Sequence, residues 1–456
     1  MLIMKFGGTS LATPVAIERV CSIIDSALRR DPVVVVSAIG RTTDQLVAAS
    51  ASGLERGRSI LADLREATEA TALAVVSQDD AARAVASVRA VFDDASEALG
   101  RVGRDGRGPS AELDALLACG ERISSDLVTL ALRKRGVTAT QLDARKLFVT
   151  ESRHGGADAR FEPTKQRLRA AVPPVLSTGA VAVMGGFIAT GEDGSPTTLG
   201  RGGSDFTASL AGAALDAEEV QIWTDVDGIM TADPSLIGSA RSLSVLSLLE
   251  ASELAYFGGR VLHPATMLPA IEHGIPIRVL NSMRPAGEGT LIVKQPPESA
   301  EVVKAVVYKE NITLIDIYST RMLMAHGFLA KIFAIFERHE TSVDMVSTSE
   351  VSVSLTVDHS EKLPQILSDL GEFARVRATP GKVIVCVVGE RIRYTLGIAA
   401  KVFQALEGIH IRMISLGASR VNVGFVVDED QLAAAVTRIH SAFFPGLSQP
   451  PGASQQ

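Results

Sequence analysis

The sequence predicts an α/β protein, a largely parallel sheet sandwiched by helices, followed by two small α+β modules. Short runs of β-branched residues alternate with longer amphipathic stretches as far as residue 295, which is typical of strand–helix–strand units. A polar segment with two prolines, residues 294–301 (KQPPESAE), then marks a boundary. Beyond it the chain contains an internal repeat, which indicates duplicated domains.

The first elements set the pattern of the sheet. Leu2–Phe6 and Val33–Ser37 are strands by composition, and Val15–Arg29 between them carries its apolar residues on one helical face. This order predicts parallel strands covered by helices. Further strands are expected at Thr138–Asp143, Val181–Ile188, Glu219–Thr224 and Ile277–Leu280.

Two longer stretches are assigned by composition. Residues 55–135 are rich in Ala, Leu, Glu and Arg and are predicted to be mostly helical, with a loop at Gly100–Pro109. Ala170–Ile188 is the longest apolar stretch, but prolines and glycines interrupt it, whereas a membrane helix needs ~20 mostly apolar residues. We interpret it as a loop followed by a buried strand.

The repeat pairs Gly327–Asp358 with Gly397–Asp428, which align without a gap. Each copy runs helix, strand, turn, strand, and the flanking residues supply another strand and helix, so that a βαββαβ module occurs twice. The predicted domains are a catalytic domain at residues 1–295, regulatory domains at 303–380 and 381–445, and a disordered tail at 446–456.

Composition narrows the class of protein. The net charge of −7 argues against a nucleic-acid or membrane-surface protein, which usually carries a basic excess. Cys21, Cys119 and Cys386 stand far apart without a CxxC pair, which predicts buried free thiols in a reducing compartment. The opening MLIMKFGG lacks the features of a signal peptide, so we expect a cytoplasmic protein.

The first motif is Lys5–Ser10 (KFGGTS), where a strand enters a loop before a helix. Glycines let a backbone approach phosphate closely, and a helix N-terminus favours anions. Lys5 adds a positive charge where a phosphoryl group would need one. The alternative is an ordinary strand–helix turn with an exposed lysine, and no GxxxxGK[ST] loop is present.

The second motif is Thr197–Asp205 (TTLGRGGSD). Its glycines and hydroxyls can form a cradle for phosphate or carboxylate, and the planar guanidinium of Arg201 suits a carboxylate. Asp205 can orient Lys5 or help to hold a metal. The alternative is a tight turn in which Ser204 caps the helix expected at Phe206–Leu215.

Two further motifs follow. Trp223–Pro234 (WTDVDGIMTADP) ends a strand in a polar, turn-rich segment, where α/β enzymes bind nucleotides, although a surface loop is the alternative. Phe257–Pro264 (FGGRVLHP) contains His263, which we interpret as a structural hydrogen-bonding residue because it precedes a proline at a helix start. Arg260 is the better functional candidate there.

Together, KFGGTS, TLGRGGSD, WTDVDGI and VLHPAT resemble the aspartate kinases of the amino acid kinase family, over the chain up to about residue 445. The repeated module resembles a pair of ACT domains, and GFLAKIF…SVDMVSTSEVSVSL resembles the effector module of lysine-sensitive bacterial enzymes. The resemblance implies the amino acid kinase fold and transfer of the γ-phosphoryl group of ATP, with Mg²⁺, to the β-carboxylate of L-aspartate. That reaction begins the pathway to lysine, threonine and methionine.

The resemblance also implies roles for single residues. The catalytic candidates are Lys5 and Asp205. The nucleotide and phosphate candidates are Gly7, Gly8, Thr9, Ser37, Thr224, Asp225, Met230, Arg260 and Val261. The substrate candidates are Thr43, Glu121, Arg201, Gly203 and Ser204. The effector candidates are Met322, Ala325, Gly327, Phe328, Leu329, Val343, Asp344, Ser349 and Glu350; metal ligands remain unassigned.

The sequence departs from the family pattern at four of its positions. Met230 stands where the family usually has Tyr, Ser235 where it has Arg, and Arg260 where it has Lys. All three lie on the nucleotide side, so they put the detail of the ATP contacts in doubt. Ala325 replaces the Ser typical of lysine-sensitive enzymes, which would weaken lysine binding or change the effector.

The chemistry and the regulation follow from charges. A substrate carboxylate is ionised at pH 7, because its pKa is near ~3.9, so no general base is needed.

Asp344 and Glu350 align with Ile414 and Arg420 of the second repeat, so a cationic effector such as lysine would prefer the first repeat. The alternative is that these acids are solvated loop charges.

Other functions stay open at this point. ACT modules usually pair edge strands between subunits, so the resemblance implies a homodimer or a dimer of dimers. The chain can instead be an amino acid kinase for another carboxylate, such as glutamate, or a catalytically inactive amino-acid sensor.

Overall fold

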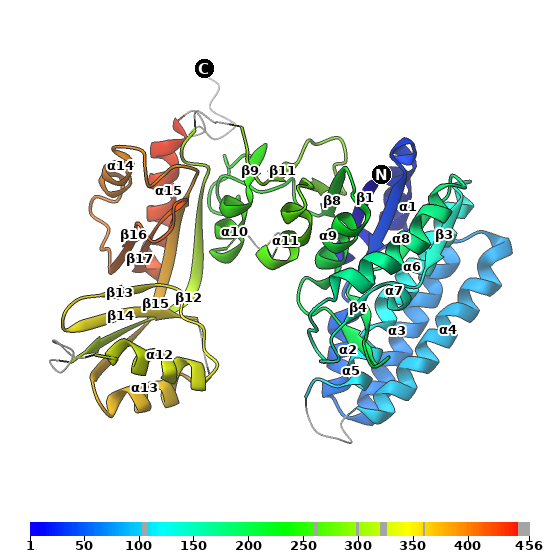
Figure 1. Ribbon diagram of the computed structural model, residues 1–456, viewed down its shortest axis with the longest axis horizontal. Helices are drawn as coiled ribbons and strands as arrows, with labels where there is room; N and C mark the ends of the chain where they lie inside the picture. The colour runs from blue at the N-terminus through cyan, green and yellow to red at the C-terminus, as the bar shows by residue number, and fades with distance from the viewer. Residues whose placement is uncertain (103–107, 259–262, 298–300, 320–325, 359–360, 446–456) are drawn as a thin grey trace, which may run out of the picture. The chain divides into compact units, whose positions relative to one another are not determined.

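The structure is a computed structural model that describes residues 1–102, 108–258, 263–297, 301–319, 326–358 and 361–445. It divides into two compact units. The first consists of Met1–Ile229, Ser244–Leu248 and Val261–Pro296, and the second of Met230–Leu243, Leu249–Arg260 and Pro297–Gln456 (Figure 1). The chain therefore enters the second unit twice before it stays there.

The described part of the first unit is built on an eight-stranded sheet in the order β3-β5-β2-β1-β8-β10-β11-β9. All neighbours from β3 to β10 are parallel, and only β10 and β11 are antiparallel, which confirms the largely parallel sheet. The strands are β1 (Leu2–Phe6), β2 (Pro32–Val36), β3 (Ala139–Leu142), β5 (Val181–Gly185), β8 (Glu219–Thr224), β9 (Val245–Ser247), β10 (Ile277–Asn281) and β11 (Thr290–Val293).

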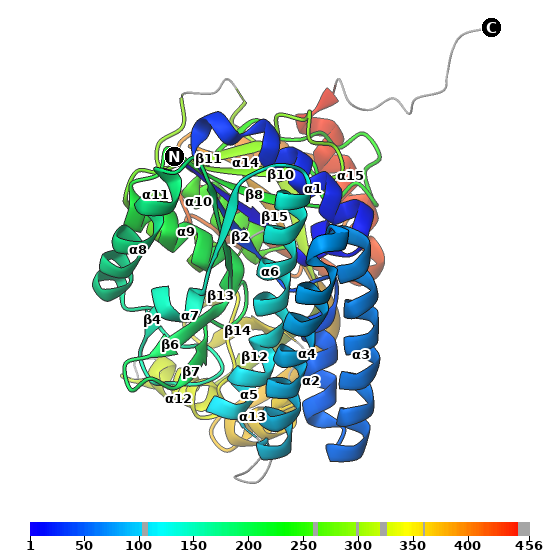
Figure 2. The ribbon, with the colours of Figure 1, turned by 90° about the vertical axis from the view of Figure 1, so that its right-hand side faces the viewer.

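Helices cover both faces of this sheet. Leu2, Met4 and Phe6 belong to one buried cluster with residues of α1, α3, α4 and α6, and α3, α4 and α6 stand side by side in Figure 2. Ile3 faces the other way, where a Cβ on Gly212 of α9 would lie 3.8 Å from it. The helices are α1 (Pro14–Ser26), α2 (Thr42–Ala51), α3 (Leu54–Val75), α4 (Gln78–Arg101), α5 (Ala111–Leu117), α6 (Cys119–Lys134), α7 (Ala144–Leu147), α8 (Phe161–Leu176), α9 (Gly203–Leu215) and α11 (Pro264–Glu272).

The single strand predicted at Val181–Ile188 is divided between two strands in the structure. The expected strand Val181–Ile188 ends at Gly185 as β5, and a new strand, β6 (Ile188–Gly191), begins after a turn. Phe187 in this turn has a φ of +65°, which breaks the extended conformation. β6 pairs with β4 (Val149–Thr150) and β7 (Pro196–Thr198) in a three-stranded sheet.

The loop predicted at the start of Ala170–Ile188 is wrong. Helix α8 continues through Pro173 and Pro174 to Leu176. A proline cannot donate a helical hydrogen bond, and it frees the carbonyl four residues earlier. Both prolines are exposed, as are Arg169 and Ala170, so water can reach the freed carbonyls.

The described part of the second unit is built on a six-stranded sheet in the order β13-β14-β12-β15-β17-β16. Each repeat contributes a helix and two strands of the predicted kind. The elements are β12 (Ala305–Tyr318), α12 (Phe328–Arg338), β13 (Val346–Thr348), β14 (Ser352–Val357), α13 (Leu363–Gly371), β15 (Arg375–Val388), α14 (Ile398–Ala405), β16 (Met413–Leu416), β17 (Asn422–Asp428) and α15 (Leu432–Phe443).

Strands β12 and β15 run through both modules. Residues 312–318 of β12 pair with 375–382 of β15, whereas residues 305–309 pair with 384–388. The second module thus takes a strand from residues that precede the first. Because the two modules share one sheet, the exact domain boundaries stay a prediction.

The two chain segments that enter the second unit become part of it. Ala232 and Ile237, from the segment Met230–Leu243, are buried in one hydrophobic cluster with residues of β15, β17 and α15. The other segment forms α10 (Leu248–Tyr256), which has its first residue in the first unit.

Two other predictions can be compared with the structure. Cys21, Cys119 and Cys386 are free and buried, as expected. Burial raises the pKa of the Cys21 thiol to about 12 and that of Cys119 to about 11. No helix within the described ranges is long and apolar enough to cross a membrane.

Candidate active site

Lys5 and Asp205 form a close ion pair. Lys5 lies in β1 and Asp205 in the first turn of α9, and Lys5 Nζ is 2.6 Å from Asp205 Oδ1. Their side chains are 11% and 15% exposed, so both charges are shielded but reachable from solvent. The structure therefore brings together the two residues that the sequence analysis placed at the phosphoryl group.

The glycine loop after β1 is packed between two other strand ends. Gly7 N donates to Trp223 O at 3.1 Å, and Gly40 N donates to Gly8 O at 3.0 Å. A Cβ on Gly8 would lie 2.6 Å from Gly40 O and 2.9 Å from Ala38 O, both of which are backbone atoms. Only glycine therefore fits at position 8. These contacts hold the loops after β1, β2 and β8 together at the carboxyl ends of parallel strands, where α/β proteins bind ligands. Thr9 is exposed beside them.

Glu121 is a buried carboxyl group with an incomplete set of partners. It lies in α6, is 3% exposed, and its Oε1 accepts a hydrogen bond from Ala38 N at 3.1 Å. Its Oε2 is buried without a hydrogen-bond partner in the described part of the chain. Burial raises the pKa of Glu121 to about 8, against the opposing effects of the backbone N–H groups and of Lys5. This acceptor suits a bound ammonium group.

Glycines in close contact with Glu121 and Ser204 fix these two residues beside the carboxyl ends of β2 and β5. A Cβ on Gly120 would lie 2.6 Å from Ala38 Cβ, and one on Gly185 would lie 2.9 Å from Glu121 O. A Cβ on Gly186 would lie 2.6 Å from Ser204 Cβ. The ends of β2 and β5, α6 and α9 thus meet with no room for larger side chains.

Arg201 projects from a glycine-rich turn. Gly200 and Gly202 have φ values of 71° and 72°, which glycine adopts at little cost. Arg201 between them is exposed and forms no ion pair with the described residues. Gly202, not Ser204, occupies the N-cap of α9, so the capping alternative for Ser204 is wrong.

The remaining substrate candidates lie near these residues. Gly203 is buried against Phe187, whose Cδ2 would be 2.7 Å from an added Cβ. Thr43 is half-buried in the first turn of α2, after Thr42, and a Cβ on Gly120 would lie 3.4 Å from the Thr42 methyl group.

Phe187 was missed by the sequence analysis. Its left-handed backbone is held by two hydrogen bonds: Phe187 N donates to Thr207 Oγ1, and Phe187 O accepts from Leu199 N, both at 2.9 Å. It therefore ties α9 to the turn that carries Arg201. A positive φ at a non-glycine residue has no signature in the sequence.

The nucleotide candidates are only partly brought together. Thr224 O accepts from Ser282 N at 2.8 Å and Thr224 Oγ1 donates to Asp225 Oδ1 at 3.1 Å, at the end of β8. Half-buried Ser37 follows β2, and its N donates to Phe6 O at 3.0 Å. Met230 belongs to the second unit. Arg260 and Val261 lie outside the described residues.

Asp344 is engaged by the protein itself. Its Oδ1 lies 2.6 Å from Lys309 Nζ and accepts a hydrogen bond from Tyr256 Oη at 2.7 Å. Lys309 also pairs with Asp358 at 2.9 Å and lies 4.7 Å from the centre of the Tyr256 ring. The Asp344 side chain is 2% exposed, so its interpretation as a solvated loop charge is wrong. Its Oδ2 is buried and lacks a hydrogen-bond partner among the residues described.

The other effector candidates vary in exposure. Gly327 precedes α12 with a φ of 79°, and Phe328 is buried, edge to face with Phe373. Leu329 is exposed and Val343 is partly buried. Ser349 and Glu350 lie in the exposed turn between β13 and β14, so Glu350 remains compatible with a solvated charge. Met322 and Ala325 lie outside the described residues.

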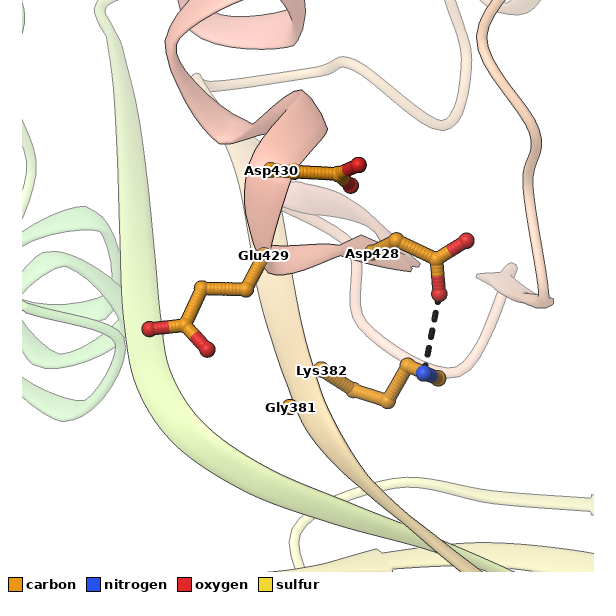
Figure 3. A pocket seen from close by; sticks show the side chains of 5 residues that line it. All are labelled: Gly381, Lys382, Asp428, Glu429 and Asp430. Atoms are coloured by element: carbon orange, nitrogen blue, oxygen red, sulfur yellow. Dashed lines mark ion pairs between the residues drawn. The ribbon is translucent and has the colours of Figure 1, made fainter.

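The second repeat also contains an ion pair between a lysine and an aspartate, at the position that aligns with Asp358. Asp428 aligns with Asp358 and pairs with Lys382 at 2.9 Å, beside a pocket that Gly381, Glu429 and Asp430 also line (Figure 3). Arg412 and Lys382 hold the pKa of Asp428 at about 2. The two aspartates differ in burial: the Asp428 side chain is 24% exposed, whereas the Asp344 side chain is 2% exposed and keeps its Oδ2 without a hydrogen-bond partner among the described residues.

Sequence comparisons connect this geometry to known proteins. Residues 1–281 match the amino acid kinase family and residues 385–443 match an ACT domain. The chain is 35% identical to lysine-sensitive aspartokinase 3 of Escherichia coli, over 97% of this chain and 99% of that protein. It is also 35% identical to chloroplastic aspartokinase 1 of Arabidopsis thaliana, over 97% of this chain and 80% of that protein.

Structural comparisons agree. The crystal structure of E. coli aspartokinase III in complex with aspartate and ADP (R-state) matches with a TM-score of 0.83 and 35% identity, over 97% of this chain and 100% of that one. The same enzyme in complex with lysine and aspartate (T-state) matches with a TM-score of 0.84, over 97% and 99%. An aspartate kinase of Clostridium acetobutylicum matches with a TM-score of 0.82 and 26% identity, over 97% and 100%.

Proposed function

Because this chain belongs to the amino acid kinase family and, within it, to the aspartokinases, we propose that it phosphorylates the β-carboxylate of L-aspartate. The products are ADP and 4-phospho-L-aspartate. A carboxylate-phosphorylating step of this kind opens the aspartate-derived amino-acid pathway.

The observation that carries this proposal is the buried carboxyl of Glu121 beside Lys5. Its free Oε2 is an acceptor for the α-ammonium group of an amino acid. Glu121 accepts a hydrogen bond from Ala38 N, and the carbonyl of Ala38 packs against Gly8 in the loop that follows Lys5. Arg201 supplies a free guanidinium for the α-carboxylate. With both ends of the amino acid held, its side-chain carboxylate is left to react.

The chemistry needs alignment and charge neutralisation rather than a general base. An oxygen of the aspartate β-carboxylate attacks the γ-phosphorus of ATP, and the bond from that phosphorus to the β,γ-bridging oxygen breaks, so that ADP leaves with the electron pair. Negative charge on the transferring group is met by Lys5, which Asp205 orients, and by N–H groups of the glycine loop other than that of Gly7, which donates to Trp223 O.

Mg²⁺ accompanies ATP in this proposal. The described residues hold no group of three or more His, Cys, Asp or Glu side chains that can bind a metal. That suits Mg²⁺, which is commonly held by substrate phosphates with one or two carboxylates and neutralises phosphate charge. Asp205, which pairs with Lys5, is the carboxylate that we propose as a contributor.

The test is hydroxamate formation from ATP, Mg²⁺ and hydroxylamine with either L-aspartate or L-glutamate. We expect aspartyl hydroxamate with L-aspartate and at most a trace of product with L-glutamate. A preference for glutamate would replace the substrate and keep the kinase. Absence of ATP turnover with either amino acid, in a folded protein, would favour the amino-acid sensor instead.

We further propose that a cationic amino acid, lysine first, inhibits the enzyme by binding near Asp344. The buried, unpartnered Oδ2 of Asp344 supports an ammonium site, and one relative of similar length carries the name lysine-sensitive. The same assay with millimolar lysine or threonine tests this: loss of activity with lysine alone is expected. Activity that lysine leaves unchanged would keep the kinase and contradict lysine as the effector.

We also propose a homodimer or a dimer of dimers. β13 and β16 are the two edge strands of the described six-stranded sheet, and edge strands can pair with another chain. Light scattering during size-exclusion chromatography measures the mass, and a monomer at micromolar concentration would contradict the proposal.

A further inference from the structure

Asp114 is a buried carboxylate that lies outside all four sequence motifs. It belongs to α5 and is 1% exposed. Oδ1 accepts a hydrogen bond from Thr198 Oγ1 at 2.6 Å, and Gly155 N donates to Oδ2 at 3.1 Å and to Oδ1 at 3.3 Å. His154 Nδ1 lies 3.3 Å from Oδ2, without hydrogen-bond geometry. Asp114 thus joins two segments far apart in the sequence.

Both segments support the turn that presents Arg201. Thr198 is the last residue of β7, and the Leu199–Gly202 turn follows it directly. Ala157 N donates to Thr198 O at 2.8 Å, and a Cβ on Gly200 would lie 3.1 Å from Gly156 Cα. The 153–157 loop is therefore in contact with the turn, and the buried Asp114 accepts hydrogen bonds from both segments.

A carboxylate at this depth depends on its donors. Burial raises the pKa of Asp114, whereas the hydrogen bonds from Thr198 and Gly155 and the nearby His154 lower it. Because hydrogen bonds to an ionised acceptor are roughly twice as strong as neutral ones, displacing the donors is costly. The donors, and with them the start of the turn, are held more firmly than a neutral side chain would hold them.

We propose that Asp114 is a positioning residue for the substrate: through Thr198 and Gly155 it fixes the turn that presents Arg201 to the α-carboxylate of aspartate. This rests on the proposed aspartate site, in which Arg201 is the carboxylate clamp. Asp114 is 1% exposed, so its effect is exerted through Thr198 and Gly155. Its effect falls on aspartate rather than on ATP, because the turn that it supports carries no nucleotide candidate.

Two variants test the inference at different risk to folding. Asp114→Asn keeps the shape of the side chain and removes its charge, and Thr198→Val removes only the hydroxyl. We expect KM for aspartate to rise ~10-fold in Asp114→Asn and less in Thr198→Val, because small misplacements of a binding group are expensive. We expect kcat and KM for MgATP to change less than ~2-fold. In the double variant the two effects on KM should not add, because both substitutions act on the same hydrogen bond between Thr198 and Asp114.

Thr164→Val is the matched control. Thr164 is also buried, and its hydroxyl accepts from Val149 N at 3.0 Å in the same three-stranded sheet, but it does not contact Asp114. It should lower the melting temperature and leave KM for aspartate unchanged.

The outcomes separate the inference from the proposed function. If the unaltered enzyme fails to phosphorylate aspartate, the proposed function fails first. If it is active, an unchanged KM for aspartate in Thr198→Val and in folded Asp114→Asn overturns the role of Asp114. An equal rise in KM for aspartate and for MgATP, or the same rise in Thr164→Val, would show general loosening and would overturn it too. Calorimetric binding of aspartate gives a readout independent of turnover.

Discussion

At the scale of single residues, the Lys5–Asp205 pair sets the expected result for the reaction itself. Lys5→Ala removes the positive charge at the end of β1, and we expect kcat to fall about 10²-fold or more, the usual loss for a group that stabilises transition-state charge. Steady-state kinetics measure it, and circular dichroism checks the fold. A folded Lys5→Ala enzyme with most of its kcat would remove Lys5 from the mechanism.

Glu121 makes aspartate binding depend on pH. Its pKa of about 8 in the folded protein means that it is largely protonated at pH 7, whereas only the ionised carboxylate attracts an ammonium group. Aspartate binding should therefore release a proton, and KM for aspartate should fall as pH rises towards about 8, by at most tenfold per pH unit, and then level off. In Glu121→Gln this slope should vanish; a slope that persists would assign the titration to another group.

The same group has a consequence for stability. The folded pKa of Glu121 lies above its ordinary value of 4.5, so the folded state binds the extra proton between pH 4.5 and about 8. By linkage, this group's contribution to the free energy of unfolding is full below pH 4.5 and is lost as pH rises to about 8. Aspartate should offset the loss, because its ammonium group stabilises the ionised form.

Single residues also show what the sequence could and could not reveal. Lys5, Arg201 and Asp205 stand in glycine-rich motifs, so their chemistry was readable from neighbours in the sequence. Glu121 was assigned only through the family resemblance. Phe187 and Asp114 were missed, because one depends on a backbone angle and the other on hydrogen bonds to distant residues.

At the scale of elements, the cluster around Asp344 sets the expected response to a cationic effector. Lys309 already neutralises Asp344, and an incoming ammonium group would be repelled by it. In Lys309→Met we expect lysine to bind ~10-fold more tightly. The substitution removes the cation that pairs with both Asp344, which is buried, and Asp358, which is exposed. Isothermal titration calorimetry measures the affinity.

Lys362→Met is the control for that prediction. It also removes a lysine paired with a carboxylate in the first repeat, Glu340 at 3.0 Å, but on the exposed surface. It should leave lysine binding unchanged. If lysine binds Lys309→Met as it binds the unaltered protein, or more weakly, the effector does not use Asp344.

Elements were predicted well where one pattern acts alone. β1, β8 and α9 follow from apolar runs and alanine-rich composition. Prediction failed in α8, which continues through Pro173 and Pro174 because water can reach the carbonyl groups that the two prolines leave without a helical donor. It also failed at Gly185–Phe187, where the chain turns within an apolar run.

At the scale of the whole molecule, the largest surprise is the path of the chain. The proline-containing segment predicts one boundary near residue 295, yet Met230–Leu243 and Leu249–Arg260 belong to the second unit. Neither segment has a composition that distinguishes it from its neighbours. Both segments flank nucleotide candidates in the sequence, Thr224 and Asp225 before the first and Arg260 at the end of the second, so the chain connects these candidates directly to the second unit.

This path predicts that the catalytic part is not independent of the rest. Ala232 and Ile237 are 2% and 7% exposed, and they pack with β15, β17 and α15. In a chain that ends at Pro296 these partners are absent, so both residues and their apolar neighbours become exposed. We expect lower solubility, binding of a hydrophobic dye and a melting temperature several degrees lower, because burial of a side chain such as that of Ile237 contributes ~1.5–3 kcal/mol.

A chain that ends at Pro445 provides the comparison. It lacks only residues 446–456 and keeps every strand and helix of the described second unit. It should match the full chain in melting temperature, in dye binding and in inhibition by the effector. If the chain ending at Pro296 melts cooperatively at the temperature of the full chain and binds no dye, then Met230–Leu243 has a second stable packing, and the regulatory unit is an attachment to an autonomous kinase rather than a part of its core.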